Sequence, residues 1–319
     1  MIDVQEKCLG ITLGDPNGIG PEITAKTLNF LHKKKIPLKF ILLGSQEAFL
    51  RSCNLAEVDY KLPNIKEFIS FNSSLNLNGK ASPEGGKISY LAICKAVELF
   101  KEKKIDAMVT APISKESLHL AGYKYDGHTG LLAELFKINN PYLMLANKKF
   151  STLHVTCHIP LKDVSKFITM HKVLETIKTG NIHMQKIGIK NPKIAVCGLN
   201  PHSGESGIFG KEELEAIIPA IKKASNLGID IKGPISGDII FREARRGSYD
   251  LVIANYHDQG HIPVKLLYFE NSVNVTLGVP FLRTSVDHGT AFDIALKNKA
   301  NPQNMLAAII YALKMLKKD

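Results

Sequence analysis

The sequence predicts an α/β protein with a mainly parallel sheet flanked by helices. Short apolar segments typical of buried strands alternate with segments whose apolar residues recur at helical spacing, along nearly the whole chain. No internal repeat or low-complexity segment interrupts this alternation. The 319 residues are enough for one large domain or two of ordinary size, and we expect two subdomains.

The first predicted strand, Cys8 to Leu13, runs directly into a glycine loop that opens a helix. The loop, residues 14–23, reads GDPNGIGPEI. A plain strand-to-helix turn needs one glycine, so three glycines with an aspartate indicate close approach of the backbone to a ligand. The loop lacks the GK[ST] of a Walker phosphate loop and the GxGxxG fingerprint of dinucleotide-binding folds.

The other elements follow in alternating order. A strand over 40–45 and a helix through Leu50 precede residues 53–86, which are rich in Asn, Ser, Pro and Gly and are expected to be irregular. Further helices are predicted over 88–101, 131–137 and 173–184; one more begins at 212, and another ends at 246. The remaining strands are predicted over 107–112, 142–145, 150–156, 194–199 and 251–254.

Composition limits the class of protein. The net charge of +11 lies largely in lysine runs without interleaved aromatic residues, and the chain has no Trp, so nucleic-acid binding is a weak alternative to the attraction of small phosphorylated or nucleotide ligands. The five scattered cysteines are expected to be reduced thiols, most of them in the core. No apolar run approaches the ~18 residues of a membrane span, and the N-terminus lacks a signal-peptide layout, so we expect a cytoplasmic protein with no membrane partner.

Three histidines share one context: His158, His202 and His257 each follow the end of an apolar strand by a few residues. Ligands of open α/β sheets bind at the carboxyl ends of strands, so these side chains could converge on a divalent metal such as Zn²⁺, Co²⁺ or Mn²⁺. Asp238 and Asp258 are candidates for orienting the imidazole rings. A single histidine at a strand end is more often a cap or a core residue. His32, His119, His171 and His183 lack this context and are expected on the surface.

Two further regions carry candidate ligand-binding residues. His128 and Thr129 precede a predicted helix, where they could bind an anion; an ordinary helix cap by Thr129 is an equally good reading. Lys265 and Arg283 are cations suited to an oxyanion. After them, residues 287–291 form a polar, glycine-containing turn that is expected to run into a helix.

These motifs together carry a family resemblance that covers most of the chain. The matching groups, in family order, are 14–23, 110–113 with Lys115, 127–129, 198–202, 256–260 with Lys265, and 274–291. They resemble the 4-hydroxythreonine-4-phosphate dehydrogenases of pyridoxal phosphate biosynthesis. More widely, 18–22 and the turn 288–295 are similar to the glycine loop and the adenosine-binding turn of isocitrate and isopropylmalate dehydrogenases.

The resemblance implies a fold of two α/β/α subdomains with a cleft, distinct from a classical Rossmann fold. A cofactor-side subdomain would cover about 1–120 plus 265–319, and a middle subdomain of about 121–264 would carry metal ligands and dimer contacts. A homodimer is implied, with the active site at the subunit interface.

The resemblance also assigns site residues. The metal ligands, supplied by both subunits, are His158, His202 and His257, for Zn, Mg or Co. Supporting carboxylates are Asp238 and Asp258. The substrate-binding positions are His128, Thr129, Lys265, Asn274 and Arg283. The cofactor, NAD or NADP, is assigned to Gly14, Asp15, Gly18, Gly20, Asp287, His288, Gly289 and Thr290.

The implied reaction is oxidation of the C3 hydroxyl of 4-phosphooxy-L-threonine to 2-amino-3-oxo-4-phosphooxybutanoate, which loses CO₂ to give 3-amino-2-oxopropyl phosphate. A paralogue acting on threonate or erythronate 4-phosphate is the nearest alternative, and a non-enzymatic anion-binding or metal-storage protein is a more distant one. The chain departs from the family pattern at Gly130, Ile239 and Leu296, where a carboxylate, a hydroxyl and a glycine are expected.

Overall fold

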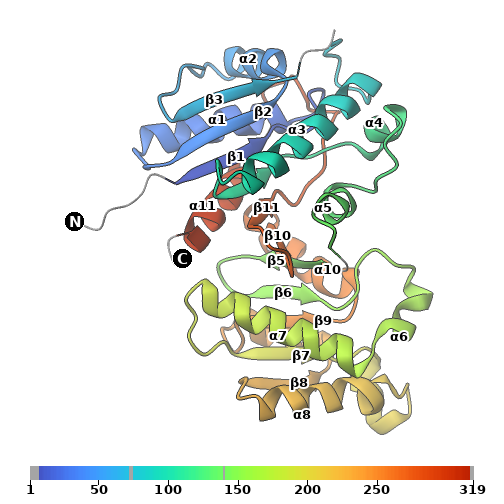
Figure 1. The fold of residues 1–319 in the computed structure, drawn as a ribbon. Coiled ribbons are helices and arrows are strands. Elements are labelled where there is room, and N and C mark those ends of the chain that lie inside the picture. Colours follow the sequence, from blue (N-terminus) through green and yellow to red (C-terminus); the bar gives the residue numbers. More distant parts are fainter. Residues whose placement is uncertain (1–6, 72–74, 139–140, 317–319) are drawn as a thin grey trace. The chain divides into compact units, whose positions relative to one another are not determined.

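The computed structural model describes residues 7–71, 75–138 and 141–316, which form two compact units (Figure 1). Unit 1 contains the described residues up to Pro141 and from Val279 onward, and unit 2 contains Tyr142–Gly278. The expected subdomain limits near 120 and 264 fall earlier in the chain than these divisions. The N-terminal residues 1–6, where no signal peptide is expected, lie outside the described residues.

The sheet of unit 1 is parallel throughout. Its strands stand in the order β3 (Ile65–Ser70), β2 (Lys39–Gly44), β1 (Cys8–Thr12), β4 (Ala107–Thr110) and β11 (Arg283–Ser285). β1, β2, β4 and β11 are almost entirely buried, as expected of a parallel sheet covered by helices, whereas the edge strand β3 is only partly buried. Parallel alignment brings the carboxyl ends of β1 and β4 to one edge, where the glycine loop follows β1.

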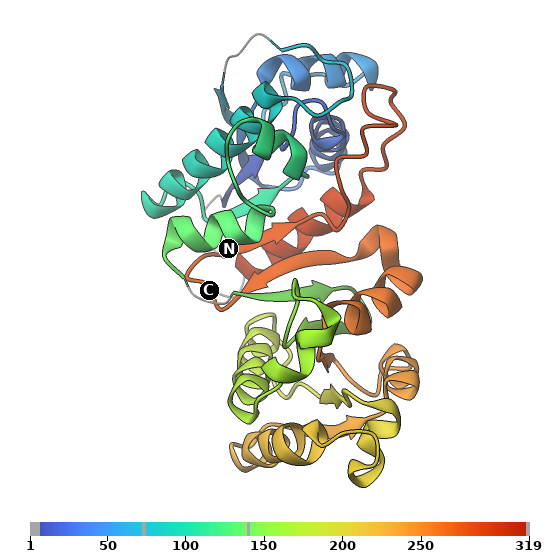
Figure 2. The same cartoon turned by 90° about the vertical axis from the view of Figure 1, so that its right-hand side faces the viewer.

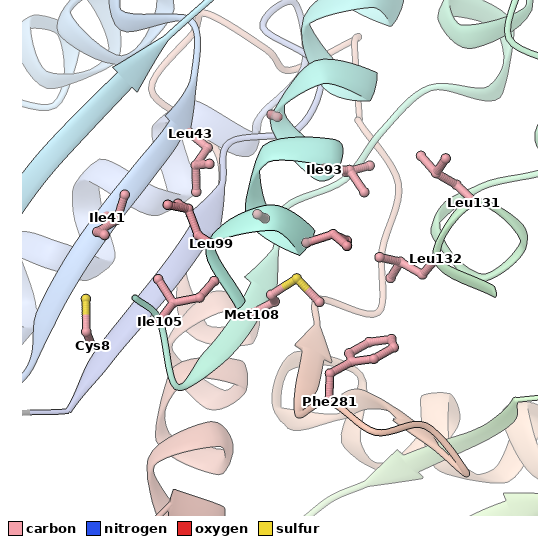
Figure 3. Packing of buried hydrophobic residues seen from close by; sticks show 13 residues of the cluster. Cys8, Ile41, Leu43, Ile93, Leu99, Ile105, Met108, Leu131, Leu132 and Phe281 are labelled. Carbon is pink, nitrogen blue, oxygen red and sulfur yellow. The ribbon is translucent and has the colours of Figure 1, made fainter. Parts of the chain in front are cut away.

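Helices cover both faces of this sheet. They are α1 (Gly20–Lys33), α2 (Gln46–Leu55), α3 (Pro83–Lys101), α4 (Lys115–Leu120), α5 (His128–Phe136) and α11 (Gln303–Leu316). Figure 1 shows α3 on one face and α1 with α11 on the other. The core beneath α3 joins Ile41 and Leu43 of β2, Met108 of β4 and Leu131 of α5, together with Phe281 (Figure 3). The element that carries His128 is therefore anchored to the sheet by its apolar side.

Unit 2 has a mixed sheet. Its strands stand in the order β10 (Val273–Leu277), β5 (Tyr142–Ala146), β6 (Ser151–His154), β9 (Leu251–Ala254), β7 (Ile194–Cys197) and β8 (Ile231–Ile235). The pairs β10–β5 and β5–β6 are antiparallel and the others are parallel. In Figure 2, β10 (orange) and β5 (green) lie side by side. Its helices are α6 (Val164–Phe167), α7 (Met170–Lys186), α8 (Ile218–Asn226), α9 (Gly237–Arg245) and α10 (His257–Tyr268), with short 3-10 turns at Leu161–Asp163, Pro201–Gly207 and Phe269–Asn271 and a π-helical turn at Glu213–Ile217.

Alternate residues of β9 face opposite layers of helices. Leu251 and Ile253 lie against Gly180 of α7, where an added Cβ would approach Leu251 to 2.5 Å. Val252 faces the other way, into a core that includes Ile240 of α9 and Val264 of α10. Burial on both faces explains why β9 is a continuous apolar run followed at once by the His257 motif.

His183 is buried on α7, at 4% exposed, so its expected surface position is wrong. Three expectations about secondary structure are also wrong. Residues 53–86 are not irregular throughout, because they contain the edge strand β3, whose charged Lys66 and Glu67 break the apolar pattern. Sequence reasoning also missed β8, an edge strand that contains Gly233 and Pro234, residues disfavoured in central strands. The turn after Thr290 does not run into a helix: 292–298 form successive turns, with a left-handed Ala291 (φ 44°) at their start.

The cysteine and membrane expectations can be checked within the described residues. All five cysteines are free thiols, and Cys8, Cys53 and Cys197 are buried, as predicted. No described helix has the length and apolar character needed to cross a membrane.

Candidate functional site

His257 is the first residue of α10 and directly follows the turn after β9. Its ring Nδ1 lies 2.6 Å from Oδ1 of Asp258. A neutral imidazole that donates Nδ1–H to a carboxylate keeps a lone pair on Nε2, which is the form that binds a metal. Asp258 therefore occupies the orienting position that the sequence suggested for it.

The structure brings His158 and His257 together but does not gather all three predicted ligands. The ring centroids of His158 and His257 are 5.7 Å apart, and His158 lies on the exposed segment after β6. His202 lies on a separate exposed turn after β7. Within the described part of the chain, no group of three His, Cys, Asp or Glu side chains is arranged to hold a metal ion. The donor chemistry fits a divalent metal, but two imidazoles leave the coordination incomplete.

A buried histidine pair that sequence reasoning missed lies behind His257. His154 is 1% exposed, and its Nδ1 lies 2.9 Å from the carbonyl oxygen of Leu143. Because a carbonyl only accepts, His154 carries its proton on Nδ1, so its Nε2 accepts from Nδ1 of His261 at 3.2 Å. The same Nδ1 of His261 lies 3.0 Å from the backbone oxygen of His257.

The pair supports the His257 ring by direct stacking. The rings of His257 and His261 are 3.6 Å apart and nearly parallel, at 11°. Burial, the largest cause, lowers the pKa of His154 to about 4 and that of His261 to about 2, so both rings are neutral at neutral pH. A helical spacing of four residues places His261 beneath His257, and this spacing was the available sequence signal.

The remaining candidates of unit 2 lie on three different elements. Asp238 is exposed in the first turn of α9, where the Ser236 hydroxyl and, less strongly, nearby His202 lower its pKa. Lys265 is half-buried on α10, with its Nζ 6.0 Å from the ring centroid of Phe269. Asn274 is half-buried on β10.

In unit 1, Arg283 is a buried cation at the start of β11. It is 2% exposed, and its Nε and Nη2 donate to the Thr110 hydroxyl at 3.2 and 2.8 Å. Burial lowers its pKa to about 9, which leaves the guanidinium charged at neutral pH. Burial and, secondly, the charge of Arg283 hold the pKa of His128 well below its usual range. The charge of Arg283 therefore acts on the His128 ring.

The N-terminus of α5 is open to a ligand. The cap position is Gly127, at φ 126°, and no side chain of the described residues caps the helix, so the interpretation of Thr129 as an ordinary cap is wrong. The Nε2 of His128 is buried and has no hydrogen-bond partner among the described residues. Free helical N–H groups, a neutral imidazole and a nearby fixed cation make an anion-binding arrangement.

Most of the glycine loop is occupied by protein contacts. Added Cβ atoms at Gly14 and Gly20 would lie 2.1 Å from the carbonyl oxygens of Pro112 and Leu13. Asp15 is fully buried, and its carboxylate accepts from the Ser117 hydroxyl at 2.6 Å and from the backbone of Asn17 at 3.0 Å. Close chain packing therefore accounts for these glycines and for Asp15.

The loop and the second predicted cofactor segment lie side by side. The backbone N–H of Ile19 donates to the carbonyl of Thr290 at 2.9 Å, and an added Cβ at Gly18 would lie 3.0 Å from the same oxygen. Asp287 is fixed by a bond from its N–H to the Asn304 side chain at 2.6 Å. His288 and Gly289 lie between these anchors, with His288 Nδ1 3.0 Å from the Gly289 carbonyl.

Comparison with known proteins gives the family. The family model described as pyridoxal phosphate biosynthetic protein PdxA matches residues 31–312. The chain belongs to this family. It is a dehydrogenase, which confirms the resemblance stated from the sequence motifs.

Individual relatives match over nearly their whole length. The 4-hydroxythreonine-4-phosphate dehydrogenase of Geobacter metallireducens is 42% identical, over 96% of this chain and 94% of the relative. An Oceanobacillus iheyensis protein named "Putative D-threonate 4-phosphate dehydrogenase" is 40% identical, over 96% and 97%. A crystal structure of 4-hydroxythreonine-4-phosphate dehydrogenase from Klebsiella pneumoniae has a TM-score of 0.84 at 35% identity and covers 99% of this chain and 100% of that one.

The wider fold prediction is also confirmed. A β-decarboxylating dehydrogenase from Thermococcus kodakarensis has a TM-score of 0.55 at 12% identity, over 98% of this chain and 84% of that one. At this identity the likeness concerns the fold alone. The chain therefore has the isocitrate and isopropylmalate dehydrogenase type of fold that its motifs predicted.

Proposed function

We propose that this dehydrogenase oxidises 4-phosphooxy-L-threonine to 2-amino-3-oxo-4-phosphooxybutanoate with NAD or NADP, and that the product decarboxylates to 3-amino-2-oxopropyl phosphate in vitamin B6 biosynthesis. The observation that carries the proposal is the anion-binding arrangement of Arg283, His128 and the open N-terminus of α5. The names of the relatives support the same class of phosphorylated substrate.

Each of these groups suits one part of a phosphate. Arg283 is held by Thr110 and buried, so it binds an oxyanion without the entropic cost of ordering a mobile side chain. His128 is neutral, so its buried Nε2 can donate or accept one hydrogen bond, depending on the tautomer. We assign Thr129, Lys265 and Asn274 to the same substrate.

We propose His158, His202 and His257 as the metal ligands, with Zn, Mg or Co as the metal. The Nε2 of His257 is presented by Asp258, and His158 lies beside it. When bound, a divalent metal lowers the pKa of the substrate hydroxyl and polarises the developing carbonyl. Asp238, whose pKa is affected by His202, would orient that ligand.

We further propose a homodimer in which both copies contribute to the active site. Unit 2 exposes several large apolar side chains that a second copy could cover, among them Leu161 (69%), Ile208 (74%) and Leu266 (82%). A second copy covering this surface would also bring additional histidines to the incomplete metal ligand set. We propose that Gly18 and Asp287–Thr290 bind the cofactor. A cytoplasmic location remains a prediction.

The test measures whether the purified protein catalyses reduction of NAD or NADP by 4-phosphooxy-L-threonine, with Zn²⁺, Mg²⁺ or Co²⁺ added in turn. We expect turnover of 4-phosphooxy-L-threonine that chelation abolishes, and a product that releases CO₂. Negligible turnover of this substrate beside rapid turnover of D-threonate 4-phosphate would contradict the proposal.

The second candidate, a dehydrogenase of D-threonate 4-phosphate or a related sugar-acid phosphate, has a specific basis. Relatives with that name match as well as those named for the first substrate. The two substrates share the phosphate end and differ in the group at C2, an amine in one and a hydroxyl in the other. The ratio of kcat/KM for the two compounds decides between the candidates.

A further inference from the structure

The turn that carries His202 has an unfavourable backbone. Five consecutive residues, 202–206, have positive φ angles of 51°, 54°, 82°, 41° and 57°, and only Gly204 among them is a glycine. The left-handed conformation is unfavourable for each residue that carries a side chain. Such a turn persists only where neighbouring groups determine it.

A buried carboxylate supplies that restraint. Glu213 is 1% exposed, and its Oε1 accepts from the backbone N–H groups of Leu199 and Asn200, both at 2.8 Å. Its Oε2 accepts from the side-chain Nδ2 of Asn200 at 2.9 Å. The carboxylate thus holds the two residues through which β7 continues into the His202 turn.

The two residues before Leu199 accept hydrogen bonds from the side chains of Asn255 and Gln259. The carbonyl of Cys197 accepts from Nδ2 of Asn255, and the carbonyl of Gly198 accepts from Nε2 of Gln259, both at 2.8 Å. Asn255 directly follows β9, and Gln259 belongs to the first turn of α10, two residues after His257. Glu213 completes a connection that fixes the start of the His202 turn relative to the helix of His257.

Two glycines pack closely against the carboxylate and its Asn200 partner. An added Cβ at Gly204 would lie 2.7 Å from Oε2 of Glu213, and one at Gly210 would lie 2.4 Å from Nδ2 of Asn200. Glu213 also begins the π-helical turn Glu213–Ile217, a distortion frequent at functional sites.

We propose that Glu213 is a positioning residue, which sets the orientation of His202 through the N–H groups of Leu199 and Asn200. This inference rests on the proposed function insofar as His202 is a metal ligand. Glu213 itself is turned inward and acts only through the turn.

The variant Glu213→Gln tests the role with little change of volume. Its amide oxygen can still face the two backbone N–H groups, but its NH₂ then opposes Nδ2 of Asn200. A flip of the Asn200 amide cannot relieve this, because the same Nδ2 also donates to Oε2 of Glu212 at 2.8 Å. Glu215→Gln is the matched control, since Glu215 lies two residues away and is exposed.

Two measurements on the full-length protein decide the matter. Hydrogen exchange of the Leu199 and Asn200 amides, without added metal, should be faster in Glu213→Gln and unchanged in Glu215→Gln. Titration with Co²⁺ alone, followed by its visible absorption, should show ~10–100-fold weaker binding in Glu213→Gln, as for other groups that orient metal ligands.

The outcomes separate the two proposals. The positioning role is overturned if Glu213→Gln folds and both its amide exchange and its Co²⁺ affinity equal those of the wild type. The same conclusion holds if only its thermal stability is lower. A wild-type protein that binds no Co²⁺ refutes the metal site of the proposed function, and exchange at the two amides then decides whether Glu213 holds the turn. If Glu213→Gln does not fold, Glu213→Asp, which keeps the charge but shortens its reach, is judged by the same two measurements.

Discussion

Replacement of Gly260 by alanine should damage the buried histidine pair. An added Cβ would lie 2.3 Å from Nε2 of His154 and 2.5 Å from Cγ2 of Thr152, whereas ordinary contacts begin at 3.4 Å. The His154 ring must therefore move by about 1.1 Å, the difference between 3.4 and 2.3 Å. Such a movement breaks its hydrogen bonds to Leu143 and His261.

The expected loss of stability combines three terms. Overpacking costs ~1–3 kcal/mol, and the loss of hydrogen bonds by buried groups costs ~1–3 kcal/mol. Alanine gains ~1 kcal/mol over glycine inside a helix. The free energy of unfolding of Gly260→Ala should thus fall by about 3 kcal/mol.

Urea unfolding followed by circular dichroism measures this change. Gly130→Ala is the control, because Gly130 also lies within a helix but has no atom within 4 Å of an added Cβ; it should gain ~0.5–1 kcal/mol. In a His154→Ala background the cost of Gly260→Ala should shrink by more than ~1 kcal/mol. Equal stability of Gly260→Ala and the wild type would refute the described packing of His154.

Three further changes test the site and the glycine loop. His202→Ala should remove most bound metal and activity while the far-ultraviolet circular dichroism stays unchanged; unchanged metal content would contradict the ligand assignment. Arg283→Lys should raise KM for the phosphorylated substrate more than it lowers kcat and should also lower the melting temperature, because one ammonium cannot replace two donors to the buried Thr110 hydroxyl. Burial raises the pKa of Asp15 above 3.8, so the stability that its protonated form contributes is present below pH 3.8 and is lost as the pH rises through the folded-state pKa. The free energy of unfolding of Asp15→Asn should therefore rise relative to that of the wild type as the pH rises. Urea unfolding midpoints of both proteins between about pH 4 and pH 7 measure this change, and a difference that does not depend on pH would contradict it.

Much of the fold could be predicted because the buried central strands are continuous apolar runs. β1 and β9 are buried along their whole length and are followed by a glycine loop and a histidine-containing motif, so their sequence shows both the strand and the edge where ligands bind. The edge strands β3 and β8 could not be found in the same way. An edge strand tolerates charge, Gly and Pro, and these residues conceal its pattern.

The site was predictable in its residue types but not in its support. His257 and Asp258 are adjacent in sequence, so their pairing follows from local geometry. Glu213 supports His202 from 11 positions along the chain, and its role depends on hydrogen bonds to backbone groups, which no side-chain pattern reveals. His154 is similar, because an isolated histidine inside an apolar strand gives no indication of its partner 107 positions away.

The motif His257–Gly260 gains a physical explanation from these contacts, since each residue faces a different neighbour. The side chain of His257 is partly exposed, Asp258 fixes its tautomer, and Gln259 binds the Gly198 carbonyl just after β7. Gly260 faces inward and leaves space for the ring of His154. Successive positions of a helix point about 100° apart, so four adjacent residues can contact solvent, a carboxylate partner, a neighbouring strand and the core. The order of the motif therefore follows from the strands that converge on the first turn of α10, and any change that moves β7 relative to β9 should alter the orientation of His257, which we propose as a metal ligand.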